Sequence, residues 1–217
     1  MMHRRAGSAL AACLALLAAG CALREPRPEG AWLAEREAWF EAHEKWSVRG
    51  RLGLSDGDRG GSLAMTWQAD GTEHVVLLRT VAGGRQWRLE MGPSGAVLTG
   101  SEIGRLAGPD PDLLVEQAVG WPIPVRWMSQ WLRGLPAPPG AATGYADDGV
   151  LQTLDWGGWQ LEFDRWRRLD GAGVLLPVRV TAENPPYRVR AALSRWNFER
   201  DGAPGSPKPT NAAVESL

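Results

Sequence analysis

Hydrophobic and polar residues alternate with a period of two along much of the chain, which is the pattern of half-buried β-strands. Leu63, Met65 and Trp67 fall on one face of such a strand, while Thr66 and Gln68 fall on the other. Tight turns with Asp-Gly or Gly-Gly sequences separate successive strands. About ten or eleven short strands are predicted, and their short connections favour an antiparallel, strongly curved sheet or open barrel over alternating strands and helices.

Two helices are predicted to interrupt the strands between Asp110 and Pro136. Asp110 can cap the first helix and Gly120 can end it, while Pro122 and Pro124 make a stiff corner before the second. Each helix carries an apolar face, formed by Leu113, Leu114 and Ala118 in the first and by Trp127, Met128, Trp131 and Leu132 in the second. This helical hairpin must cover a sheet, because nearly everything on both sides of it is strand-like.

A further helix is predicted at the start of the folded domain, over Ala31–Trp46. Trp32, Trp39 and Trp46 recur at intervals of seven residues, close to two helical turns each. Tryptophan is abundant throughout, with twelve residues against three phenylalanines and two tyrosines. A core with so many large, rigid side chains is either tightly filled or lines a cavity. The segment His74–Thr80 is apolar on both faces, which suits a wall with core on one side and a cavity or helix on the other.

Signals for catalysis are weak. The sequence has no nucleophile elbow, zinc-binding helix or phosphate loop, and His43 and His74 have no neighbours at metal-ligand spacing. Glu162 and Asp164 would share one strand face, where a solvated surface is favoured over an acid–base pair. The formal net charge of −1 shows no basic excess and argues against nucleic acid as a partner. We therefore expect no enzymatic activity and no metal.

The first residues have the pattern of a targeting segment rather than of a folded element. Arg4 and Arg5 precede an apolar run that is shorter than the roughly 20 residues of a membrane-spanning helix. The small residues before Cys21 resemble the lipobox of bacterial lipoproteins, which implies cleavage before Cys21 and diacylation of its sulfur. The alternative is an ordinary signal peptide with an incidental cysteine. The predicted organisation is a signal peptide at 1–20, a lipidated tether at 21–30, a folded domain at 31–200 and a disordered tail at 201–217.

Several segments of the chain resemble the LolB family of outer-membrane lipoprotein receptors. They are WSVRGRLGL at 46–54, GSLAMTWQ at 61–68, GWPIPV at 120–125 and WLRGLP at 131–136. The likeness runs in order from about Trp32 to Phe198 and is most specific over 120–136. It implies an incomplete antiparallel barrel of about 11 strands, with helices that cover a hydrophobic cavity. It also implies that the protein takes the acyl chains of lipoproteins from a periplasmic LolA-like carrier and places them in the outer membrane.

The resemblance also implies how the protein is anchored and where it works. We expect a monomer on the periplasmic face of the outer membrane, held by diacylglycerol and N-acyl chains on Cys21 and needing no other cofactor. In sorted lipoproteins an aspartate directly after the cysteine favours retention in the inner membrane. Ala22 stands at this position, so the outer membrane is implied, and outer-membrane lipid becomes a further expected partner.

Two groups of site residues follow from these expectations. The family carries a protruding loop with an exposed leucine that is important for delivery. The corresponding loop here is Thr80–Gly84, where Ala82 takes the position of the leucine and Val81 lies beside it. Alanine offers less apolar area than leucine, so either Val81 or the nearby Trp87 is expected to compensate for it at the membrane. The acyl-chain cavity is expected to be lined by Trp67, Leu77, Leu89, Trp127 and Trp131.

Three alternatives share the same sequence features. A lipocalin-like envelope lipoprotein would bind a small apolar ligand tightly, without handing it on. An envelope hydrolase acting on lipid or peptidoglycan would need a nucleophile or a carboxylate pair clustered in a cleft. A structural lipoprotein would have a filled core. A roomy apolar cavity without such a cluster would favour the receptor over the hydrolase and the structural lipoprotein, whereas transfer from a carrier would separate it from the lipocalin-like binder.

Overall fold

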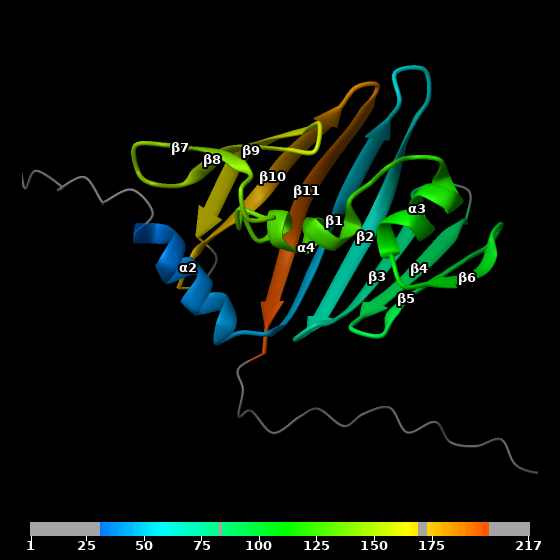
Figure 1. Cartoon of the computed structure of the whole chain (residues 1–217), viewed down its shortest axis with the longest axis horizontal. Coiled ribbons are helices and arrows are strands. Elements are labelled where there is room, and N and C mark those ends of the chain that lie inside the picture. Colours follow the sequence, from blue (N-terminus) through cyan, green and yellow to red (C-terminus); the bar gives the residue numbers. More distant parts are fainter. Residues whose placement is uncertain (1–30, 83, 169–172, 200–217) are drawn as a thin grey trace, which may run out of the picture.

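The computed structural model describes residues 31–82, 84–168 and 173–199. The predicted signal peptide, tether and tail therefore lie outside the described residues, as does Cys21. Within them, the chain forms one sheet of eleven strands and three helices (Figure 1). The helices are α2 (Ala31–Glu41), α3 (Pro111–Val119) and α4 (Val125–Leu132).

The sheet consists of two antiparallel meanders, which are joined in the middle of the sheet by pairing of the first strand with the last. Its order is β6-β5-β4-β3-β2-β1-β11-β10-β9-β8-β7, so the first strand pairs with the last and the two edge strands do not pair with each other. The predicted incomplete antiparallel barrel is therefore confirmed. The strands are β1 (Lys45–Ser55), β2 (Gly60–Asp70), β3 (Glu73–Thr80), β4 (Gln86–Gly92), β5 (Gly95–Gly100), β6 (Gly104–Gly108), β7 (Ala142–Tyr145), β8 (Leu151–Trp156), β9 (Trp159–Arg168), β10 (Leu175–Asn184) and β11 (Tyr187–Phe198).

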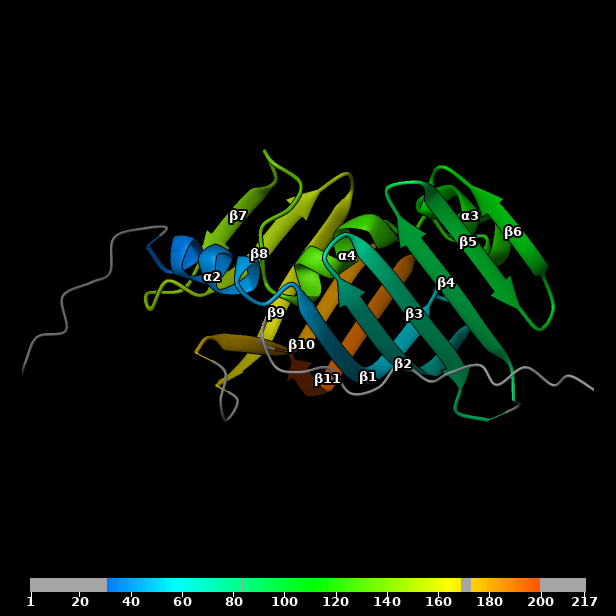
Figure 2. The same ribbon diagram turned by 90° about the horizontal axis from the view of Figure 1, so that it is seen from below.

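The chain crosses from one sheet edge to the other through the helical hairpin. Seen from below, the sheet is bent and α4 lies between its two halves, with α3 near β5 and β6 (Figure 2). This crossing places the hairpin on the inner face of the sheet, where it buries apolar residues that alternate along the strands. The inner face of the sheet and the two helices thus share one core.

The hairpin has the ends that its sequence predicts. The Asp110 side chain accepts hydrogen bonds from the backbone N–H groups of Asp112 and Leu113, and Gly120 ends α3 in the left-handed conformation, with φ of 75°. The two helices are also joined to each other. Arg126 of α4 pairs with Asp110, and its Nε lies 2.7 Å from Asp112 Oδ2. These contacts fix the corner of the hairpin.

The first helix is shorter than the tryptophan spacing predicts. It ends at Glu41, and Trp46 belongs to β1 instead. Trp46, Val48 and Leu52 are the buried inward positions of this strand. The period of seven between Trp39 and Trp46 is therefore accidental, because pairing of β1 with β2 starts one residue before Trp46. Cross-strand pairing and burial outweigh the helical pattern here.

A bulge interrupts β11 where the alternation of its buried residues slips between Leu193 and Trp196. Arg49 of β1 lies opposite Arg195, but the next residue, Gly50, lies opposite Leu193, which leaves Ser194 as the extra residue. The backbones approach so closely here that a Cβ on Gly50 would meet the Ala192 carbonyl oxygen at 2.5 Å. Glycine is therefore required at this point of the strand pair.

Candidate functional site

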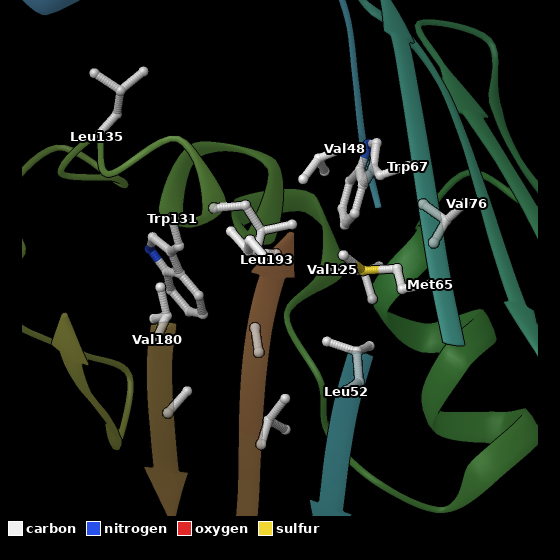
Figure 3. Close-up of a cluster of buried hydrophobic side chains, with 14 of the residues drawn as sticks. Val48, Leu52, Met65, Trp67, Val76, Val125, Trp131, Leu135, Val180 and Leu193 are labelled. Carbon is white, nitrogen blue, oxygen red and sulfur yellow. The ribbon is translucent and has the colours of Figure 1, made fainter. Parts of the chain in front are cut away.

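An apolar cavity of about 220 Å³ lies between the inner face of the sheet and the helical hairpin. Strands β1 to β5 and β11 form its floor, and α3, α4 and the corner between them form its roof. Figure 3 shows Leu52, Met65, Trp67 and Val76 on the sheet side, with Val125 of α4 next to Met65. Every lining residue is apolar: Leu52, Leu54, Leu63, Met65, Trp67, Val76, Leu78, Trp87, Leu89, Leu98, Val115, Val119, Ile123, Val125, Met128 and Val189.

The cavity continues beneath α4 towards the other half of the sheet. A narrow apolar space of about 30 Å³ shares Ile123, Met128 and Val189 with it and reaches Trp131 and Trp159. Trp131 stands between α4 and strands β10 and β11 (Figure 3). Apolar side chains therefore line the space below the hairpin on both sides of α4.

The wall beside Trp67 contains a histidine that is held neutral. The Trp67 indole N–H donates to His74 Nδ1 at 3.1 Å, so this nitrogen carries no proton. Burial, together with the positive charge of Arg133, lowers the pKa of His74 to about 4. This pair keeps the polar ring atom of a tryptophan satisfied without placing a charge at the cavity.

Two of the predicted cavity residues line this cavity and one lies in its continuation. Trp67 and Leu89 line the main space, on β2 and β4 respectively. Trp131 lines the narrow space below α4 and is nearly fully buried, and its indole N–H donates to the Ala137 carbonyl at 2.7 Å. Trp131 therefore also holds the segment after α4, so a charged residue in its place would disturb the fold as well as the cavity.

The structure does not bring the other two predicted residues to the cavity. Leu77 follows the buried Val76 on β3, and alternation turns its side chain to the outer face, where it is 38% exposed. The expectation that both faces of this strand meet core or cavity is corrected accordingly. Trp127 of α4 contacts Trp156 edge-on at 6.1 Å and lines a separate hollow towards α2. It is one residue before Met128, and this step of about 100° around the helix turns it away from the cavity.

Several cavity residues were not predicted from the sequence, for two different reasons. Leu52, Leu54 and Leu78 lie at inward positions of alternating strands, so the sheet period could have identified them. Val115 and Val119 lie on α3, on a face that the periodicity of Leu113 and Leu114 did not suggest. Only the docking of α3 on β5 selects which side of this short helix points inward.

Exposed apolar residues lie at the loop between β3 and β4 and on α3. Val81 is 58% exposed, and the following Ala82 is also exposed. On α3, Val119 is 47% exposed while lining the cavity, so it lies at the cavity opening. Leu113 is 62% exposed but does not line the cavity. Both α3 residues are therefore exposed, but only Val119 lines the cavity.

This arrangement is suited to binding hydrocarbon and carries no polar group that could orient a polar substrate. Among the described residues no cluster of His, Cys, Asp or Glu could hold a metal ion. No helix in the described part of the chain is long and apolar enough to cross a membrane. The fold and the site together define the class of protein: an open antiparallel sheet bent around an apolar cavity beneath a helical hairpin.

Comparison with solved structures shows that this fold is a known one. The chain superimposes on a LolA superfamily protein from Nitrosomonas europaea with a TM-score of 0.51 and 7% sequence identity, covering 77% of this chain and 93% of that one. At this identity the likeness concerns the fold alone. It shows that the two chains share the same overall fold.

Sequence comparison establishes the family. The family model described as "Outer membrane lipoprotein LolB" matches residues 44–196. Proteins named outer-membrane lipoprotein LolB from Xanthomonas campestris and Marinobacter nauticus are 35% and 33% identical over 169 and 184 residues, covering 76% and 81% of this chain and 78% and 88% of those proteins. One from Chromohalobacter salexigens is 30% identical over 194 residues, covering 87% of this chain and 89% of that protein. The chain belongs to the LolB family of outer-membrane lipoproteins.

Proposed function

We propose that this protein accepts acylated lipoproteins from a periplasmic carrier and inserts them into the outer membrane, on whose periplasmic face it is itself anchored. Its family supports a role in lipoprotein localisation. The observation that carries the proposal is the wholly apolar cavity under α3 and α4. Acyl chains cannot cross the periplasm exposed, because each CH₂ left in water costs about 0.8 kcal/mol.

The proposed mechanism requires no bond chemistry and no enzyme. The cavity would receive acyl chains because it binds them more tightly than the carrier does, and it would lose them to a bilayer that binds them more tightly still. Diacylglycerol and N-acyl chains on Cys21, through the 21–30 tether, would hold the domain next to its target membrane. Val81 and Ala82 would form the tip that meets the bilayer during delivery.

The proposal is tested by placing a charge at the cavity opening. Val119→Arg puts a guanidinium where acyl chains would enter, and burying it against hydrocarbon is costly. We expect transfer of an acylated lipoprotein from a loaded carrier to fall about tenfold or more. Leu113→Arg is the matched control, because it adds the same charge to the same helix at an exposed position outside the cavity. It should leave transfer unchanged.

The result also separates the proposal from its alternatives. Equal transfer by both variants and the unmodified protein would show that the cavity does not hold the acyl chains. Tight retention of fatty acid without delivery to vesicles would instead indicate a binder of small apolar ligands. Both variants must first show unchanged thermal unfolding, so that a loss of transfer reports the cavity rather than the fold.

A further inference from the structure

The outer face of the sheet carries arginines in two cross-strand rows, here called the arginine band. Residues directly opposite each other in antiparallel strands share a face, so the strand register identifies the rows. The first row is Arg105, Thr99, Arg88, Leu77, Thr66, Arg49 and Arg195. The second row is Gln86, Arg79, Ala64, Arg51, Ala192, Arg179 and Arg165.

The charge of the band is largely uncompensated. Neither row contains an acidic residue, and all arginines of the band are exposed. Arg88 pairs with Glu90 at 2.6 Å, but the other arginines of the band have no carboxylate partner among the described residues. Arg49 lies directly opposite Arg195, and Arg179 directly opposite Arg165. Like charges in such positions destabilise a sheet, so the sheet itself gains nothing from this arrangement.

A hollow of about 620 Å³ lies within the band on β2 to β5. Arg79 and Arg88 border it, and Thr66, Thr99 and Ser101 add hydroxyl groups. Guanidinium and hydroxyl groups are the donors that bind phosphate oxygens. The band therefore combines a broad positive surface with a recess of suitable chemistry for a phosphate-bearing headgroup.

We propose that the arginine band is a docking surface for the anionic phosphate headgroups of a membrane. The exposed Val81 favours a bilayer, because it follows Arg79 by two residues at the end of β3 and so places an apolar tip beside the band. A protein partner is less suited to this surface. Protein interfaces have an apolar and aromatic centre, whereas Leu77 is the one large exposed apolar residue in the band.

This inference deepens the proposed function and rests on it for the direction in which the domain faces its membrane. The arginine band is separate from the cavity, because the two lie on opposite faces of the same strands. Each arginine near an anionic surface raises the affinity for the membrane about fivefold, and salt screens this contribution. Several arginines together would hold the outer face of the sheet close enough to the membrane for Val81 to reach the bilayer.

The test measures vesicle binding by the full chain with Cys21→Ser, so that no acyl anchor contributes. We expect co-sedimentation with phosphatidylcholine vesicles that contain phosphatidylglycerol, weakening as salt is raised, and little binding to phosphatidylcholine alone. Replacing Arg49, Arg51 and Arg79 by glutamine should weaken binding roughly a hundredfold. The control replaces Arg59, Arg167 and Arg168 by glutamine, which removes the same charge outside the two rows.

Each outcome decides the proposal. Loss of binding in the band variant alone supports it, provided that both variants keep the thermal unfolding of the parent chain. Equal loss in the control would overturn it, because net charge rather than the band would then be responsible. Absence of vesicle binding, with a carrier interaction that fails only in the band variant, would also overturn it in favour of an acidic protein. Acyl uptake should be unchanged in the band variant, and failure of uptake in the parent chain would count against the proposed function alone.

Discussion

The Arg36 side chain donates to the main-chain carbonyl of Arg133, whose own guanidinium repels it. The bond from Arg36 Nε is 2.8 Å long, and another Arg36 nitrogen donates to the Leu175 carbonyl at 2.5 Å. Arg36 is only 3% exposed, and burial together with Arg133 lowers its pKa to about 9, which leaves it charged at neutral pH. It has no carboxylate partner among the described residues, and the ring of Trp166, 4.8 Å from its guanidinium carbon, provides a cation–π contact instead.

This cation joins three elements that are distant in the sequence. Arg36 belongs to α2, Arg133 follows α4, and Leu175 opens β10. We predict that Arg36→Lys lowers the free energy of unfolding by roughly 2 kcal/mol, because an ammonium cannot reach both carbonyls with the geometry of the guanidinium fork. Urea unfolding checks this prediction. The conservative exchange Arg167→Lys, at an exposed position of β9, should change the midpoint little, and similar midpoints for both variants would contradict it.

His74 gives the protein a defined sensitivity to acid. Its pKa is about 4 in the folded protein, below the ordinary value of about 6.5 that it regains on unfolding. Above about pH 6.5 the residue is neutral in both states, and its effect on stability is absent. As pH falls from about 6.5 to about 4, the unfolded chain binds a proton that the folded protein refuses, so the free energy of unfolding decreases. Below about pH 4 both states are protonated and this loss is complete.

We expect the loss from His74 to be on the order of 2 kcal/mol, after allowance for its partial exposure. His74→Gln should remove this part of the pH dependence between pH 4 and 6.5, while its amide can still accept from Trp67. Chemical unfolding at several pH values measures the slope. An unchanged slope in the His74 variant would show that another group titrates.

The bulge opposite β1 makes a prediction about a single glycine. Gly50→Ala would place a Cβ 2.5 Å from the Ala192 carbonyl oxygen, which belongs to the backbone and cannot rotate away. We expect a loss of roughly 2–3 kcal/mol in unfolding free energy, from strain at this strand pair. Gly53→Ala, on the same strand, meets nothing nearer than 3.9 Å and should be close to neutral. Thermal unfolding of the two variants should therefore differ by several degrees, and equal melting temperatures would exclude the strain.

The sequence predicted the parts of the fold that depend on local pattern. The hairpin ends at Asp110 and Gly120, the strands and the bulge near Leu193 all follow from residue type and alternation. Trp46 was misplaced because a period of seven and a period of two both include it, and only pairing with β2 decides between them. The same limit applies to the cavity. Alternation could have excluded Leu77, but the side of α3 that faces inward depends on tertiary docking.

The arginine band was hidden for a different reason. A net charge of −1 averages over the whole chain, whereas the band depends on which strands become neighbours. Arg49 and Arg195 are nearly 150 residues apart and become opposite only because the first strand pairs with the last. Composition can therefore argue against a basic protein but not against a basic face. The register of the sheet is the information that the sequence alone lacked.

The loop at Val81 leads to a prediction about delivery rather than uptake. If Val81 and Ala82 enter the bilayer, each CH₂ buried contributes about 0.8 kcal/mol. Val81→Ala removes two carbons and should slow release of a bound lipoprotein into vesicles roughly tenfold. Ala82→Leu adds three carbons and should accelerate release by a similar or larger factor. The two variants thus change the rate in opposite directions, which a general effect on stability would not do.

The measurement of this prediction must separate loading from release. The protein is first loaded from the carrier, and vesicles are then added so that only the second step is timed. Leu113→Ala removes apolar surface from an exposed position on α3 and should leave the release rate unchanged. Uptake should be normal in all three variants, since neither Val81 nor Ala82 lines the cavity. Release rates that are insensitive to both loop variants would mean that the lipoprotein leaves the cavity without help from this loop.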